Sequence, residues 1–177
     1  TGAGPAGSLD GTFDARMASG TFYGRPFDSA RMSGTYQRGD EARFDRAEIR
    51  RGSGVVRMTG RYGFSPPFPW DLDVSFAGVS LRDAGLPGGE WAGSASGTAT
   101  LRGSFEHPDV RFAANGDGVS LRGMPLGTLQ VGGTAKEKQL VVTGGADGLR
   151  FEAEATLEGR IPFRARADLA LDDVARF

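Results

Sequence analysis

The only histidine of the chain, His107, is the first candidate for chemistry. A Ser-His-Asp triad or an imidazole metal site would need it, yet there is no Gly-x-Ser-x-Gly elbow, no cysteine and no second histidine. His107 stands in Glu106-His107-Pro108-Asp109, where proline fixes φ and aspartate can close an Asx turn. We therefore expect a turn here, with neither a catalytic residue nor a metal.

Paired carboxylates are the second candidates, because two acids can act together in glycoside hydrolysis. Asp71 and Asp73 are two positions apart and would share one face of a strand, whereas Asp172 and Asp173 are adjacent. The first pair alternates with apolar residues, so we expect it to face solvent. A carboxylate-dependent hydrolase is the weakest hypothesis, and we expect the chain not to be an enzyme.

Two glycine-rich segments faintly resemble calcium loops, namely Asn115-Gly116-Asp117-Gly118 and Gly145-Ala146-Asp147-Gly148. Both lack the twelve-residue spacing and closing glutamate of an EF-hand, and we expect tight hairpin turns with positive φ. In Phe64-Ser65-Pro66-Pro67-Phe68-Pro69-Trp70 we expect a strand connection whose Phe68 and Trp70 cover an end of a sheet, in preference to a polyproline ligand. None of these segments calls for a cofactor.

The composition narrows the class of partner. With 21 basic and 22 acidic residues the formal net charge of the 177-residue chain is −1, which gives no long-range field for nucleic acid. The absence of cysteine leaves the compartment open. No stretch approaches the roughly 20 apolar residues of a transmembrane helix. The first residues show no signal-peptide pattern, and because the chain begins at Thr1 without a methionine, we expect it to be a segment of a longer protein.

Alternation of apolar and polar residues with period two predicts strands along most of the chain. Clear examples are Val56, Met58, Gly60 and Tyr62, with Arg57 and Arg61 between them. The 29 glycines punctuate these runs without a three-residue period. We predict an all-β fold of repetitive, mainly antiparallel strands, forming either an elongated U-shaped (taco-like) sheet or an open sandwich with a hydrophobic inner face.

A shift of 99 positions places the second half of the chain on the first. Gly24-Arg25-Pro26-Phe27 falls on Gly123-Met124-Pro125-Leu126, and Phe13 falls on Phe112. We therefore predict a first β repeat unit over residues 1–85, a Gly/Pro-rich connector over 86–97 and a second unit over 98–177.

The hydrophobic side of the predicted strands is the remaining candidate for a functional site. Its bulky residues alternate with glycine and alanine, a pattern that suits both a closed sandwich core and an open groove for acyl chains. The candidates for a lipid groove follow from the alternation alone: Met32, Met58, Val74, Phe76, Leu101, Phe112, Leu129, Val131, Val142, Phe151, Leu157 and Phe163.

The segments GTATLRGSFEHPDV (97–110), GVSL (118–121) and GTLQV (127–131) resemble the TamB and AsmA-like repeat proteins of bacterial envelopes. The sequence pattern of that family consists of a glycine-bounded strand, a leucine-x-glycine, a proline-containing turn and then short strands of alternating apolar residues. SGTFYGRPF (19–27) is similar to it in the first copy.

This resemblance implies a periplasmic segment of an inner-membrane-anchored protein with a hydrophobic groove. The implied function is phospholipid transport to the outer membrane, or outer-membrane protein assembly beside a TamA-like barrel. Phospholipid acyl chains would be the ligand, with no cofactor. The alternative from the residues is a surface or adhesin-like structural β-repeat module with a closed core.

Overall fold

The computed structural model describes residues 10–22, 24–37, 40–84, 86, 89–104, 106–137, 139–146, 149–156 and 163–169. Nearly all of its elements are strands. In chain order they are β1 (Gly11–Met17), β2 (Gly20–Phe22), β3 (Arg25–Phe27), β4 (Ser29–Gln37), β5 (Glu41–Arg51), β6 (Gly54–Gly63), β7 (Trp70–Ser80), α1 (Leu81–Ala84), β8 (Trp91–Gly103), β9 (Pro108–Leu121), β10 (Met124–Lys136), β11 (Gln139–Ala146), β12 (Leu149–Thr156) and β13 (Phe163–Leu169).

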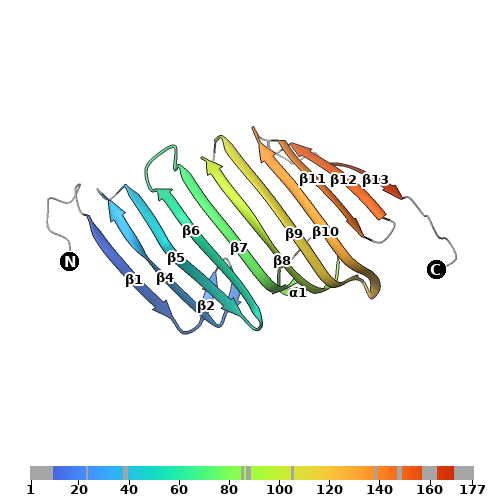
Figure 1. Cartoon of the computed structure of the whole chain (residues 1–177), viewed down its shortest axis with the longest axis horizontal. Helices are drawn as coiled ribbons and strands as arrows, with labels where there is room; N and C mark the ends of the chain where they lie inside the picture. Colours follow the sequence, from blue (N-terminus) through green and yellow to red (C-terminus); the bar gives the residue numbers. More distant parts are fainter. Residues whose placement is uncertain are drawn as a thin grey trace.

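Eleven of these strands form one antiparallel sheet in the order β1-β4-β5-β6-β7-β8-β9-β10-β11-β12-β13, and β2 and β3 form a separate hairpin. Figure 1 shows the strands of the large sheet side by side in a single row from the blue end to the red end. Among the described residues β1 pairs only with β4 and β13 only with β12, so the sheet is open. The all-β, antiparallel prediction is confirmed.

The tight turns between long strands rely on residues that tolerate positive φ. Gly52 has a φ of 54° between β5 and β6, and its amide donates a hydrogen bond of 2.6 Å to the carboxylate of Asp28. Between β9 and β10, Arg122 and Gly123 have φ values of 51° and 79°, the signature of a primed hairpin turn. Such turns match the twist of the strands and hold the register.

The predicted 99-residue repeat extends to the strand pairing. In the first copy Phe13 pairs with Gly34 and Ala15 with Met32; the corresponding pairs in the second copy are Phe112 with Gly133 and Ala114 with Val131. The hairpin β2–β3 obeys the same rule, because its Thr21–Pro26 pair corresponds to Ser120–Pro125 of β9 and β10. One continuous β9–β10 ladder therefore replaces two shorter ladders of the first copy.

The repeat register is lost beyond β4 and β10. Gly34 pairs with Phe44, so the shift would pair Gly133 with Thr143, but Gly133 pairs with Val142. The reason is the turn: it runs from Gln37 to Glu41 in the first copy and only from Lys136 to Gln139 in the second.

Two predictions on boundaries are wrong. Residues 91–97, expected in the connector, form the first half of β8, which pairs with β7 on one side and β9 on the other. Asn115-Gly116-Asp117-Gly118, expected as a hairpin turn, lies inside β9. Gly118 does have a positive φ, of 57°, but it accommodates a β-bulge where β8 and β9 change register near Gly93. A β-bulge and a tight turn both need a residue that adopts a positive φ, so the glycine pattern alone does not distinguish them.

Packing within the large sheet joins bulky side chains to glycines on the adjacent strand. In four directly opposed Phe–Gly pairs the ring lies against the glycine: Phe13–Gly34, Phe76–Gly97, Phe112–Gly133 and Phe151–Gly144. A Cβ atom built on each of these glycines would collide with the partner's ring, at 2.6 Å for Gly133 and 2.8 Å for Gly97. Each ring therefore lies over the backbone of its neighbour and shields apolar area without a second layer.

The small elements gather at one end of the sheet, the lower end in Figure 1. The hairpin β2–β3 contacts β5, and α1 contacts β7 and β8, while every other strand packs mainly against its hydrogen-bonded neighbours. Arg51 and Asp83 form an ion pair of 2.8 Å between β5 and α1. The whole chain exposes 12193 Å², against about 8,200 Å² for a typical globular protein of its mass. This large surface fits a single layer of strands.

We expect Gly133→Ala to destabilise the fold by about 1–3 kcal/mol, because the new methyl group would meet both the Phe112 ring and the Val141 carbonyl oxygen at 2.6 Å. The matched control is Gly132→Ala, next along β10, whose methyl group would meet only the Phe112 carbonyl oxygen at 3.5 Å. Denaturant unfolding monitored by circular dichroism compares the two. Equal stability of both variants would contradict ring-over-glycine packing.

Candidate functional site

One face of the large sheet carries three adjacent rows of apolar residues, because residues paired across an antiparallel ladder project to the same side. We call this surface the apolar face and define it by three rows that run from β1 to β12. The first row is Phe13, Gly34, Phe44, Gly60, Leu72, Leu101, Val110, Ala135, Leu140 and Ala155. The second row is Ala15, Met32, Ala47, Met58, Val74, Ala99, Phe112, Gly133, Val142 and Ala153. The third row is Met17, Ala30, Ile49, Val56, Phe76, Gly97, Ala114, Val131, Gly144 and Phe151.

The structure brings the predicted groove candidates together on this face. Those in the rows or directly beside them are half-buried: Met32, Met58, Val74, Phe76, Leu101, Phe112, Leu129, Val131, Val142 and Phe151. Leu129 extends the face by one position, opposite Gly116. Leu157 lies outside the described residues, and the backbone of Phe163 pairs with Ala155. The candidate site is thus a broad, partly exposed surface and not a cavity.

The sequence pattern missed several members of the apolar face, chiefly Phe44 and Ile49 of β5. In that strand the alternation changes phase, since Phe44 pairs with Gly60 but Ala47 pairs with Met58. Asp45 and Arg46 together oppose the single Thr59, which is a β-bulge. The adjacent charged pair that interrupts the alternation was the available signal.

The opposite face of the sheet is polar and internally ion paired. The carboxylate of Asp71 forms ion pairs with Arg61 at 3.1 Å and with Arg102 at 2.9 Å. Arg102 also forms an ion pair with Asp73, at 2.8 Å. The hydrogen bond to Asp73 raises the pKa of Arg102 further above its already high value. The two carboxylates considered for hydrolysis therefore serve as acceptors for arginines on an exposed ladder.

A second ion-pair group on the polar face surrounds Glu48, a buried carboxylate of β5. It accepts hydrogen bonds from Arg46 at 2.9 Å, Arg50 at 2.7 Å and Arg57 at 3.0 Å. The bonds from Arg46 and Arg50 outweigh the loss of hydration and lower the pKa of Glu48 to about 2. The group ties two positions of β5 to β6.

His107 lies in a turn, as predicted, although different atoms close it. The amide of Ser104 donates to the carbonyl of His107 at 3.2 Å, and the amide of His107 donates to the hydroxyl of Ser104 at 3.2 Å. Pro108 and Asp109 already belong to β9. The turn that joins β8 to β9 is thus closed by a serine and not by the aspartate.

The connection between β6 and β7 places its aromatic residues at the other end of the sheet from α1. The indole of Trp70 donates to the carbonyl of Arg102 at 2.9 Å, so it links β7 to β8. Phe64 contacts Tyr62 edge-to-face at 5.5 Å but is 51% exposed, and Phe68 is 37% exposed. Trp70 packs at the sheet end as predicted, whereas Phe68 covers less than expected.

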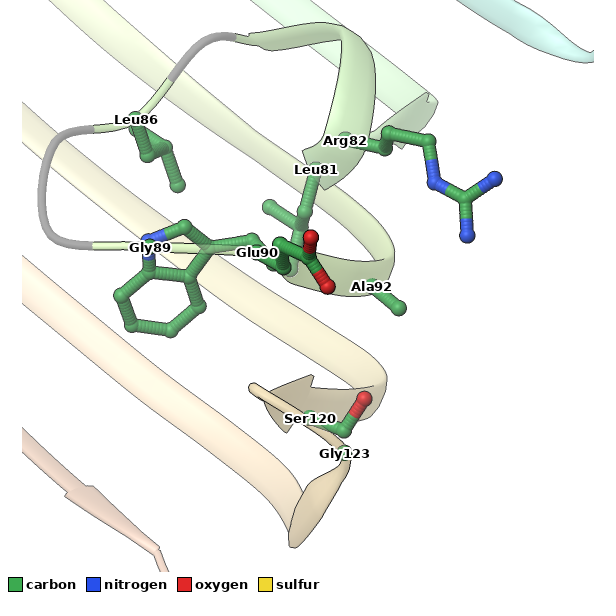
Figure 2. A pocket seen from close by; sticks show the side chains of 9 residues that line it. Leu81, Arg82, Leu86, Gly89, Glu90, Ala92, Ser120 and Gly123 are labelled. Carbon is green, nitrogen blue, oxygen red and sulfur yellow. The ribbon is translucent and has the colours of Figure 1, made fainter.

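A recess of about 650 Å³ opens at the α1 end, where the loop before β8 approaches the β9–β10 turn. Figure 2 shows Leu81 and Leu86 on the side of α1 and its loop, Ser120 and Gly123 on the opposite side, and the guanidinium of Arg82 extending outward. The lining of the recess mixes apolar and charged side chains.

Within the described residues no group of three or more histidine, cysteine, aspartate or glutamate side chains is placed to hold a metal ion. In the same part of the chain no helix has the length and apolar character needed to cross a bilayer.

We expect Glu48→Gln to lower the melting temperature at pH 7, because three arginines would lose their carboxylate. Since the folded-state pKa is depressed from 4.5 to about 2, ionised Glu48 stabilises the fold fully above pH 4.5 and progressively less toward pH 2. The difference from the parent should therefore shrink over that range. Asp45→Asn, which removes an exposed ion pair of 3.8 Å, is the control and should change little. A pH-independent difference for Glu48→Gln would contradict this assignment.

No family model, no curated protein and no solved structure matches this chain. The resemblance to TamB and AsmA-like proteins therefore stays a prediction, and support for a function has to come from the two faces of the sheet.

Proposed function

We propose that the chain is a segment of a TamB/AsmA-like envelope protein whose apolar face holds the acyl chains of phospholipids on their way to the outer membrane. It would act in the periplasm, as part of an inner-membrane-anchored protein that works beside a TamA-like barrel. The observation that carries the proposal is the unbroken apolar face, whose three rows contain no charged side chain across ten strands.

The chemistry of an acyl chain suits such a surface. Hydrocarbon makes no directional bonds, and each buried methylene group contributes about 0.8 kcal/mol. Rings that pack over glycines of the neighbouring strand leave few protruding side chains between them, so a flexible chain can pack against the surface in many positions. Binding of this kind requires no polar contact with the head group.

The size of the face also supports the proposal. The ten neighbouring strands that carry the face, about 4.8 Å apart, span roughly 43 Å across the sheet. That width exceeds the roughly 30 Å of a bilayer's hydrocarbon core, so a chain could be passed from strand to strand over a distance comparable to a membrane.

A structural repeat module is the competing function. It would need a second layer over the apolar face, which the described residues do not supply. Under that hypothesis another polypeptide would cover the face, and no lipid would reach it.

Photocrosslinking tests the proposal without disturbing the fold by a buried charge. We expect benzoylphenylalanine at position 142 to crosslink phospholipid when the chain is incubated with phosphatidylethanolamine–phosphatidylglycerol vesicles, because Val142 is half-buried on the apolar face. The matched control is position 143, since Thr143 is exposed and projects to the polar face. Mass spectrometry identifies the adducts. Equal yields at both positions, or no lipid adduct at position 142, would overturn the proposal.

A charge on the apolar face should weaken binding. We expect Val131→Asp to weaken the affinity for a BODIPY-labelled C12 fatty acid by about tenfold or more, whereas Gln130→Asp, one residue away on the exposed polar side, should leave it unchanged. Fluorescence titration measures affinity, and circular dichroism checks the fold. In a structural module the parent chain would bind no dye, and Val131→Asp would unfold it.

A further inference from the structure

The free edge of β1 corresponds, through the internal repeat, to an edge that is occupied elsewhere in the sheet. The pairs Phe13–Gly34 and Ala15–Met32 of β1 and β4 correspond to Phe112–Gly133 and Ala114–Val131 of β9 and β10. Strand β9 also pairs with β8 along its other edge. In the described part of the chain β1 has β4 as its only neighbour in the sheet.

The free edge of β1 lacks the features that usually block strand addition. The strand contains no proline, and its ladder with β4 shows no bulge over Gly11–Met17. Its two charged residues, Asp14 and Arg16, project to the polar face. They form an exposed ion pair with each other at 3.4 Å, and Asp14 forms a second one with Arg31 at 3.6 Å. An edge without proline, bulge or inward charge is open to pairing with another strand.

We propose that the free edge of β1 accepts an extended antiparallel strand with the side-chain pattern of β8, which continues both faces of the sheet. The register follows from that of β8 on β9, where Ala99 pairs with Phe112 and Leu101 with Val110. On β1 the same register sets an alanine opposite Phe13 and a leucine opposite Gly11.

Side-chain size restricts the sequence that this edge accepts. Phe13 already lies over Gly34 and meets Phe44 edge-to-face at 5.8 Å, so the position next to it on the incoming strand has to be small. Met17, which is 45% exposed, would likewise meet the alanine that corresponds to Ala95. On the polar side Thr98 would stand opposite Asp14, without like-charge repulsion. The edge therefore selects by size on one face and tolerates hydroxyls on the other.

The probe is a fluorescein-labelled synthetic peptide of residues 91–103, WAGSASGTATLRG, added to the full chain. We expect saturable binding in fluorescence anisotropy, together with slower hydrogen exchange of the amides in Gly11–Met17 and unchanged exchange in β2 and β3. No protection of β1 at saturating peptide would overturn the proposal.

Exchanging a large and a small side chain between the peptide and β1 distinguishes binding in this register from non-specific binding. A peptide with Ala99→Phe should bind the parent chain about tenfold more weakly, because two phenylalanines would compete for one site over Gly34. The same peptide should recover its affinity on a Phe13→Ala chain, whose fold is checked by circular dichroism. Equal binding of both peptides to the parent chain would refute the register. Backbone pairing at this edge and acyl binding on the apolar face use different atoms, so either can fail alone.

Discussion

The structure depends on the packing of bulky side chains over glycines of the neighbouring strand. In a two-layer sandwich, apolar residues are covered by the opposite sheet. Here the strands of the large sheet form one layer, and the ring of a phenylalanine such as Phe112 packs against Gly133 of the neighbouring strand. The glycines are therefore packing positions as much as turn residues, and they explain how an extended single sheet can be specific in its register.

Glycine at these positions also determines the shape of the candidate site. A second large side chain opposite each ring would raise the surface and separate the rows, and it would collide with the ring itself. With glycine and alanine in between, the apolar face stays continuous and partly exposed across the strands. An open surface of this kind differs from an enzyme cleft, and it suits a ligand that has no fixed shape.

The two faces divide the work of stability and recognition. On the polar face the charges satisfy one another: Glu48 holds three arginines, and Arg102 joins Asp71 to Asp73. Few of these groups remain to bind an outside charge, which agrees with the near-neutral composition. The surfaces that we propose for recognition are the apolar face and the free edge of β1.

The amino-acid sequence by itself determined the all-β class, the division of most strands into an apolar and a polar side, and a repeat whose register is followed by the pairs of β1–β4 and β9–β10. It did so because period-two alternation and turn-forming glycines are local properties. The phase change at Asp45 and Arg46 and the bulge at Gly118 were not readable, since a bulge is defined by the partner strand. Only the tertiary structure decided that β8 joins the two copies into one sheet, that phenylalanine meets glycine, and that the described strands form a single layer. Alternation specifies which side of a strand is apolar, but an open face and a sandwich core require the same alternation, so the choice between them depends on contacts between residues far apart in the chain.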